Sequence, residues 1–209
     1  MTPTASADRP RLLARALRLE YLTVGWNVAE GVIAIAAAMA SGSVALLGFG
    51  IDSFVESASG SVLIWRLHAE RRAADEERIE QVERRARRLV AASLALLAAY
   101  VAWDSITSLF AGERPEPSVV GIALAAVSLV VMWWLAREKR RVGVALGSRA
   151  MTADAFQTDA CFWLSLFLLL GIGANALFGW WWADPLAALA MTVFIGREAL
   201  EAWRGEDAD

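Results

Sequence analysis

Long apolar runs separated by short polar segments dominate this chain. Five of the runs approach the roughly 20 residues that a helix needs to cross a bilayer core, and another is longer, with a polar first half typical of a helix that lines a cavity. Together they predict six helices, at residues 19–40, 44–67, 88–110, 118–136, 149–174 and 182–203. We therefore expect an all-α membrane protein with one six-helix transmembrane domain at 19–203, a cytoplasmic segment at 1–18 and a short tail at 204–209.

Composition supports a membrane protein and excludes several other classes. Hydrophobic residues make up 57% of the chain, which contains ten Trp, and the mean hydropathy is +0.45. A soluble globular domain is nearer one-half apolar and lacks long uncharged runs. The sequence has no glycine-rich phosphate loop, nucleophile elbow or zinc-protease motif. We expect neither an enzyme, a bound cofactor, a nucleic-acid partner nor an ATP-driven pump.

The basic residues are distributed very unequally between the two sides of the predicted bundle. Of the 20 Lys and Arg, only Arg114 falls in a connection on the side opposite the termini. The others, Lys139 among them, are placed in the terminal segments or in the connections after the second and fourth helices. The positive-inside rule then predicts that both termini are cytoplasmic. The charged stretch 68–88 predicts that two helices continue into the cytoplasm as a hairpin, and a bacterial inner membrane is the expected location.

Two carboxylates lie inside one of the membrane-spanning runs. Asp52 and Glu56 fall within residues 43–65, which contain no Lys, Arg or His. An ionisable side chain at mid-membrane costs about 3 kcal/mol or more. The i, i+4 spacing places both carboxylates on one face of a helix. Two anions so close together favour binding of a cation or a shared proton.

Other helices bring further carboxylates to a similar depth. Glu30 on the first helix and Asp159 on the fifth are each about 15–18 Å from the cytoplasmic end, counting 1.5 Å per residue. Asp154 and Gln157 lie closer to the cytoplasm on the same fifth helix. Because isolated charges facing lipid are very unfavourable, we expect these groups to converge on a wet interior cavity. Glu30 and Asp154 are expected to assist binding or to relay protons.

The chemistry of such a cavity leaves two interpretations open. Three or four carboxylates can bind divalent zinc, manganese, iron or cobalt. Because like charges oppose a second ionisation, an empty site can hold protons and lose them to a cation. The alternative is a buried carboxyl network that only fixes helix packing. The single cysteine, Cys161, cannot form an intramolecular disulfide, and we see no Cys-rich metal site. The only histidine, His68, is expected to be solvated at the cytoplasmic end of the second helix.

Three segments resemble a known family of membrane proteins. The first is Ser-Gly-Ser-Val-Ala-Leu-Leu at 41–47, followed by Asp52-Ser-Phe-Val-Glu56. The others are Ala-Asp-Ala-Phe-Gln-Thr-Asp at 153–159 and Trp-Ala-Asp-Pro-Leu-Ala-Ala-Leu at 182–189. They are similar to helices two, five and six of the cation diffusion facilitator (cation efflux) family. The third segment also reads as a helix start, because Asp suits the N-cap and Pro the first turn.

The resemblance implies a homodimeric exporter of divalent metal, with one site per subunit between the second and fifth helices. Its ligands here would be Asp52, Glu56 and Asp159. The family's usual histidine is replaced by Ala155, and Glu56 stands where the family usually has Asp. Because the imidazole is missing, we expect the selectivity to shift from zinc toward harder ions. Glu30, Asp154, Gln157 or water could supply the fourth ligand in place of the histidine. The family's cytoplasmic metal-binding domain is not expected after the sixth helix.

We therefore predict a proton-coupled secondary transporter, an antiporter that moves a divalent cation outward through the membrane. Two other functions remain open at this point. One is a membrane protein that binds metal or partners without transport, because its site is degraded by loss of the histidine. The other handles protons through the same carboxylates without a metal. Metal flux coupled to protons would distinguish the first prediction from both alternatives.

Overall fold

Six long helices make up almost the whole of the structure. The computed structural model describes residues 3–71, 76–112 and 114–204. Its elements are α1 (Pro3–Ser41), α2 (Val44–Arg71), α3 (Glu76–Ala111), α4 (Val119–Leu146), α5 (Arg149–Phe178) and α6 (Ala183–Arg204). The described residues contain no strand. The predicted all-α fold with six helices is thus confirmed.

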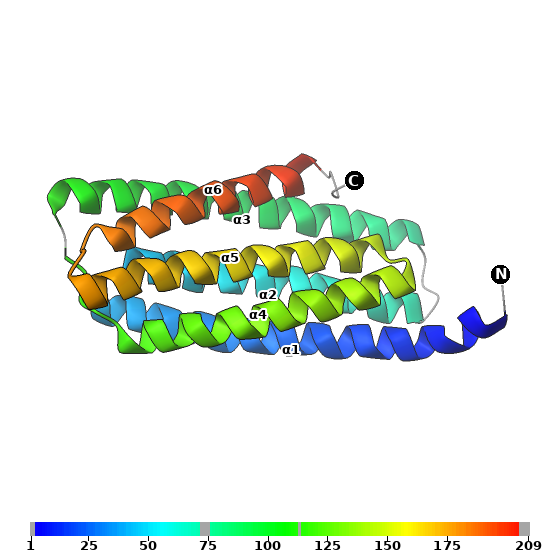
Figure 1. The fold of residues 1–209 in the computed structure, drawn as a ribbon. Helices are drawn as coiled ribbons and strands as arrows, with labels where there is room; N and C mark the ends of the chain where they lie inside the picture. Colours follow the sequence, from blue (N-terminus) through cyan, green and yellow to red (C-terminus); the bar gives the residue numbers. More distant parts are fainter. Residues whose placement is uncertain (1–2, 72–75, 113, 205–209) are drawn as a thin grey trace.

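The helices run lengthwise beside one another, and both termini lie at the same end of the bundle (Figure 1). α2 is the central helix, because it packs against α1, α3, α5 and α6. α1 also packs on α4, and α4 packs extensively on α5. The main partner of α3 is α6, beside which it runs. A side chain on α2 is therefore enclosed by several neighbouring helices.

Several helices continue past their predicted bounds at the end of the bundle that holds the termini. α1 begins at Pro3 rather than residue 19, and α4 ends at Leu146 rather than 136. Arg, Lys and Glu are good helix formers in water, so a helix does not end where its apolar run ends. α2 continues to Arg71 and α3 begins at Glu76. Residues 72–75 and the side chains of 70–87, where the charged hairpin was predicted, lie outside the described residues.

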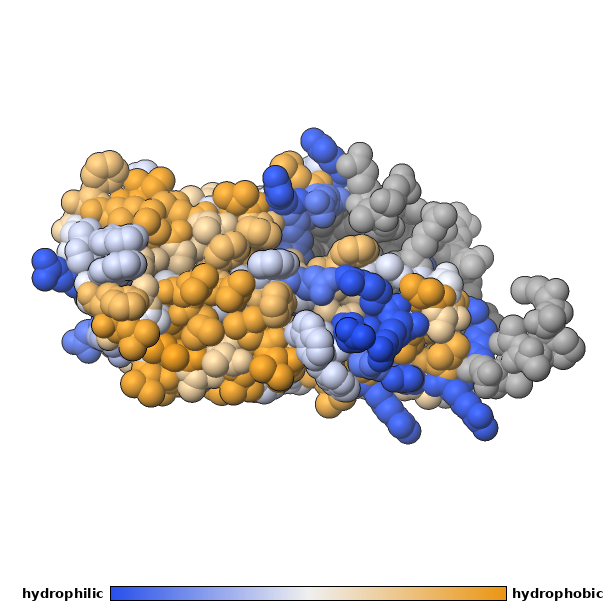
Figure 2. All heavy atoms as spheres, in the orientation of Figure 1, coloured by the Kyte–Doolittle hydropathy of each residue, from blue (hydrophilic) through white to orange (hydrophobic). Residues whose placement is uncertain are grey.

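Four helices are long and apolar enough to cross a membrane by composition alone. The candidate spans among the described residues are Arg9–Ser41, Leu94–Ala111, Val119–Leu146 and Ala150–Phe178. In α2 the two acidic residues lower the hydropathy, and charged residues interrupt α6. Both nevertheless lie alongside the other four (Figure 1). Figure 2 shows a broad apolar surface toward one end and hydrophilic residues gathered toward the other, the arrangement of a multi-pass membrane protein.

A tight turn joins α4 to α5 and sets the alignment of these two helices. Gly147 adopts φ 64° after the last turn of α4, a left-handed conformation that favours glycine. The next residue, Ser148, caps α5 by accepting a hydrogen bond from the Met151 amide at 3.3 Å. The two helices therefore run antiparallel directly after the turn. Residues on the last turns of α4 face residues on the first turns of α5.

The apolar interior consists of two clusters, one toward each end of the bundle. Along α2, buried members of the first cluster lie at 44–49 and those of the second at 63–67. Between these positions α2 carries Asp52, Ser53, Glu56 and Ser57, all of them buried. The polar candidates of the sequence analysis thus occupy a layer between two hydrophobic clusters.

Candidate functional site

Asp52 and Glu56 are both buried in the interior, as the sequence predicts. Their exposed fractions are 4% and 2%. Counted from the start of α2, Asp52 lies about 12 Å along the helix and Glu56 about 18 Å. Both carboxyl groups contact the same residue of α5, so they share one face of α2. This face is where two anionic groups meet a second helix.

The residue of α5 that contacts both carboxyls is Cys161. Its Sγ lies 2.7 Å from Glu56 Oε2 and donates a hydrogen bond to that oxygen. The same sulfur lies 3.7 Å from Asp52 Oδ2. The Cys161 side chain is itself 3% exposed. The thiol was not recognised from the sequence as part of the site, and it is the group of α5 that completes the contact with α2.

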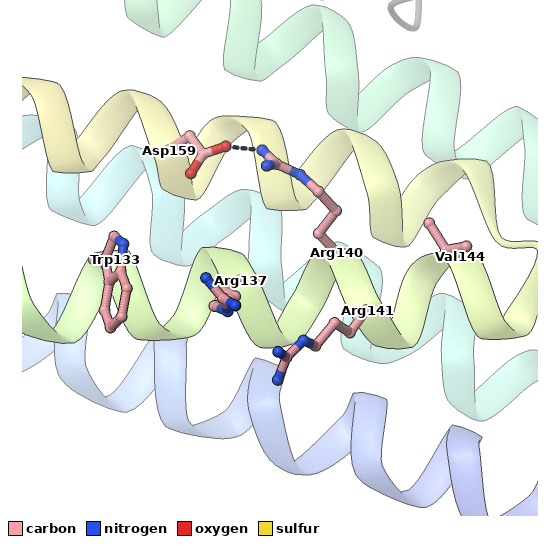
Figure 3. Close-up of a pocket in the computed structure, with 6 residues that line it drawn as sticks. All are labelled: Trp133, Arg137, Arg140, Arg141, Val144 and Asp159. Atoms are coloured by element: carbon pink, nitrogen blue, oxygen red, sulfur yellow. Dashed lines mark hydrogen bonds and ion pairs between the residues drawn. The ribbon is translucent and has the colours of Figure 1, made fainter.

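Asp159, the predicted ligand from α5, points away from this contact. Its carboxyl pairs with the Arg140 guanidinium, and the two side chains are 37% and 47% exposed. Figure 3 shows Asp159 at a surface pocket formed by α4 and α5, together with Trp133, Arg137, Arg140, Arg141 and Val144. The expectation that Asp159 would converge with Asp52 and Glu56 is therefore not met. Residues 159 and 161 differ by about 200° around a helix, so only one of them can face α2.

Glu30 lies next to the site on α1 but is held by hydrogen bonds of its own. It accepts a bond from Ser53 Oγ of α2 at 3.1 Å and another from Ser128 Oγ of α4. Trp26 Nε1 donates a third at 3.3 Å. Glu30 is fully buried and close enough to Asp52 and Glu56 to interact with their charges. Its carboxyl thus links three helices at the level of the site.

Asp154 does not reach the carboxyl pair either. It forms an ion pair with Lys139 of α4, whose ammonium is completely buried. The same ammonium lies 3.2 Å from Glu20 Oε2 of α1. Lys139 was expected in the connection after the fourth helix, which is wrong, because α4 continues to Leu146 and the partners of Lys139 lie on α1 and α5. Neither Lys139 nor Glu20 was recognised as a buried charge.

A hydroxyl group connects this ion-pair cluster to the candidate site. Lys139 Nζ donates a hydrogen bond to Thr158 Oγ1 at 3.2 Å. The Thr158 hydroxyl lies 3.4 Å from Glu56 Oε1 and can donate to it. A continuous polar path therefore runs from the Asp52–Glu56 pair to Glu20 and Asp154. Charges at one end of this path are felt at the other, because the surroundings are apolar.

α6 adds one more carboxylate that sequence reasoning missed. Glu198 interacts electrostatically with Asp52 and Glu56, and it contacts Gln157 of α5. Gln157 in turn accepts a hydrogen bond from Ser59 Oγ of α2 at 3.1 Å. Glu198 was not singled out in the sequence. A signal was present, because Ile195, Glu198 and Ala199 share one face of α6.

Asp184, near the start of α6, acts at the other end of the bundle. Asp184 accepts hydrogen bonds from Ser43 Oγ and from the Val44 amide, the latter at 3.1 Å. It thereby caps the N-terminus of α2, where backbone amides lack partners. The sequence predicts a capping role at the start of α6, whereas the hydrogen bonds of Asp184 cap the neighbouring α2 and Asp184 itself lies in the first turn of α6. It fixes the start of the helix that carries the carboxyl pair.

A pattern along α5 could have identified its inward face. Asp154, Thr158, Cys161 and Ser165 follow the spacing of one helix face, and all four are buried. In the described residues no group of three or more His, Cys, Asp and Glu is arranged so that it could hold a metal ion. The side chains at the site instead bond to one another, with Cys161 as donor and Glu56 as acceptor. Such an arrangement holds protons, and a cation would have to replace them.

Comparison with known proteins places the chain in a family. Residues 22–204 match the model of the cation efflux transmembrane domain. An uncharacterized transporter of Synechocystis is 27% identical over 173 residues, which cover 81% of this chain and 56% of the relative. The cation-efflux pump FieF of Shewanella oneidensis is 29% identical over 98 residues, which cover 44% of this chain and 33% of the pump.

The magnetosome protein MamB of Paramagnetospirillum magneticum is 26% identical over 164 residues, which cover 77% of this chain and 55% of MamB. The chain thus spans about half the length of these two curated relatives, each of which matches more than three quarters of it. The match to the family model covers all six helices except the first part of α1. The chain belongs to the family of the cation efflux transmembrane domain, a family of membrane transporters rather than enzymes.

Proposed function

We propose that this protein exports a divalent metal ion from the cytoplasm in exchange for protons, and that the ion binds between α2 and α5. The observation that carries the proposal is the buried contact of Asp52 and Glu56 with the Cys161 thiol. Two carboxylates and a thiolate on facing helices are ligands of borderline divalent metals. Asp52, Glu56 and Cys161 are therefore the proposed ligands.

The ligand types favour certain metals over others. Thiolate ligands suit zinc and iron, whereas carboxylates alone suit manganese and magnesium. With Cys161 in place of Asp159, the ligand set changes from all oxygen to mixed sulfur and oxygen. We therefore place zinc, cobalt and iron ahead of manganese. This reverses the preference for harder ions that the missing histidine indicates.

The same three groups also account for the proposed exchange of the metal ion for protons. A thiol and a carboxylic acid must lose their protons before they bind a metal ion, so binding releases protons. In the ion-free arrangement the Cys161 proton bonds to Glu56, which keeps it inside the bundle. Glu30, which is held by three donors, and Asp154, which is paired with Lys139, support the site rather than bind the ion. Exchange of metal for protons is the direct result of this chemistry.

The test is metal flux into proteoliposomes under an imposed pH gradient. We expect zinc uptake with counter-flow of protons in the unmodified protein and its loss in Asp52→Asn. Asp159→Asn is the matched control, because it removes a carboxylate of α5 that faces the surface pocket (Figure 3). This variant should transport at close to the unmodified rate.

Other outcomes would contradict the proposal in distinguishable ways. Zinc binding without flux in any liposome would indicate a membrane metal-binding protein that does not transport. Proton movement without any metal would indicate that the carboxylates handle protons alone. Loss of flux in Asp159→Asn but not in Asp52→Asn would show that the site was assigned to the wrong face of α5.

A further inference from the structure

Asn27 of α1 is buried in the bundle with no partner for its side chain. Its exposed fraction is 0%. Neither Oδ1 nor Nδ2 has a hydrogen-bond partner in the described part of the chain. Leaving a buried polar group without a partner costs about 1–3 kcal/mol. Helix packing alone would favour an apolar residue here, so the amide calls for another explanation.

The pairing of α1 with α2 places this amide at the candidate site. Ser53 of α2 donates to Glu30 of α1 at 3.1 Å. Further along, a Cβ built on Gly60 would come within 2.9 Å of Val24 Cγ2. Asn27 lies one helical turn from each of these two α1 residues. It therefore faces α2 midway between the two contacts, at Glu56.

The same neighbour follows from proximity, because the Asn27 amide lies close enough to the Glu56 carboxyl to stabilise its charge weakly, without the geometry of a full hydrogen bond. That carboxyl also contacts the Cys161 sulfur at 2.7 Å. Glu56 is thus flanked by an amide from α1 and a thiol from α5. The thiol is already engaged as a donor, whereas the amide of Asn27 forms no hydrogen bond that meets the usual distance and angle limits.

We infer that Asn27 Oδ1 is a ligand of the transported divalent cation, together with Asp52, Glu56 and Cys161. This inference rests on the proposed function and adds a third helix to the site. Amide oxygens are accepted ligands of divalent cations, and they add no charge. Two carboxylates, a thiolate and an amide oxygen supply the four ligands of a tetrahedral ion. Ion binding then draws α1 together with α2 and α5.

The test measures zinc affinity and stability on the same purified protein in detergent. In Asn27→Ala we expect zinc affinity to fall about tenfold or more, as for the loss of a group that supports a metal. The melting temperature of the ion-free variant should be unchanged or higher, because no protein partner is lost. Asn27→Asp keeps an oxygen at the same position and should bind zinc nearly as well as the unmodified protein.

Asn175 offers a matched control, because it is another buried asparagine but has a protein partner. Its Nδ2 donates to the Pro115 carbonyl at 2.7 Å. Asn175→Ala should lower the melting temperature and leave zinc affinity unchanged. The opposite pattern in Asn27→Ala, with affinity lost and stability kept, is what a ligand requires.

Three results would overturn the inference. Unchanged zinc affinity in Asn27→Ala would exclude a ligand role. Failure of that variant to fold would also count against it, because a side chain without protein partners is not needed for folding. Absence of zinc, cobalt and iron binding in the unmodified protein would instead overturn the proposed function, and the inference with it, before any substitution is compared.

Discussion

A separation of two residues on α5 decides the chemistry of the site. Asp159 and Cys161 lie on opposite faces of the helix, since successive residues turn by about 100°. Resemblance to a motif identifies the helix correctly but does not fix its rotation. The structure places the thiol against Glu56 and the carboxylate against Arg140. One ligand position therefore changes from oxygen to sulfur.

Binding of Co²⁺ tests directly whether the Cys161 sulfur is a ligand of the metal ion. Co²⁺ bound by a thiolate has an intense sulfur-to-metal charge-transfer absorption, which an all-oxygen site lacks. We expect this band in the unmodified protein and in Asp159→Asn, and its absence in Cys161→Ser. The chain has no other cysteine, so no second thiol can produce the signal.

The same Cys161→Ser variant should shift the preference from zinc toward manganese, because a hydroxyl replaces a soft ligand. Competition between the two ions in a binding titration measures this shift. Equal zinc preference in both proteins, with no charge-transfer band in either, would show that the sulfur is not a ligand.

At the scale of helices, the number and order of the helices could be predicted well from the sequence, but the residues at which they begin and end could not. Apolar runs reveal the membrane-spanning portions because lipid requires them. They do not reveal where a helix stops in water, as α1 and α4 demonstrate. The carboxyl pair on α2 was also predictable, because charges inside an apolar run are conspicuous. Lys139 was not, because it lies among charged neighbours and owes its burial to residues far away in the sequence.

Two ion pairs join α1 to α4, and their burial predicts very different effects on stability. Lys139 pairs with Glu20 where both side chains are fully buried. Arg15 pairs with Glu138, but the Arg15 side chain is 58% exposed. Lys139→Met leaves two buried carboxylates without their cation, and we expect it to destabilise the protein by about 3–5 kcal/mol. Arg15→Ala should cost no more than about 1 kcal/mol.

Unfolding of the two variants in detergent, followed by helical circular dichroism, measures this difference. Adding Glu20→Gln to Lys139→Met should recover part of the loss, because it removes one of the two unpaired charges. Equal destabilisation by Lys139→Met and Arg15→Ala would mean that the buried pair contributes no more than the exposed one.

At the scale of the whole molecule, the charge distribution and the proposed site bear on the direction of the proposed transport. Figure 2 shows the hydrophilic surface gathered toward one end of the bundle, the end at which Figure 1 places both termini. The Lys139 cluster lies between this end and the carboxyl pair, joined to the pair through Thr158. Glu20 and Asp154 therefore lie nearer to the charged end than Asp52 does. If that end is cytoplasmic, this order of positions suits the proposed export.

Cysteine labelling can test the orientation, and the native chain favours the experiment. The single Cys161 is 3% exposed, so the unmodified protein should react little with a membrane-impermeant maleimide. Glu116 lies exposed in the connection between α3 and α4, and Ala145 lies exposed near the opposite end of α4. In intact bacterial cells we expect Glu116→Cys to be labelled and Ala145→Cys to be labelled only after the membrane is opened. The positive-inside rule requires this result, because among the described residues Arg114 is the only basic residue on the side of Glu116. The reverse pattern would place both termini outside, and the ligands of α2 and α5 would then serve uptake rather than export.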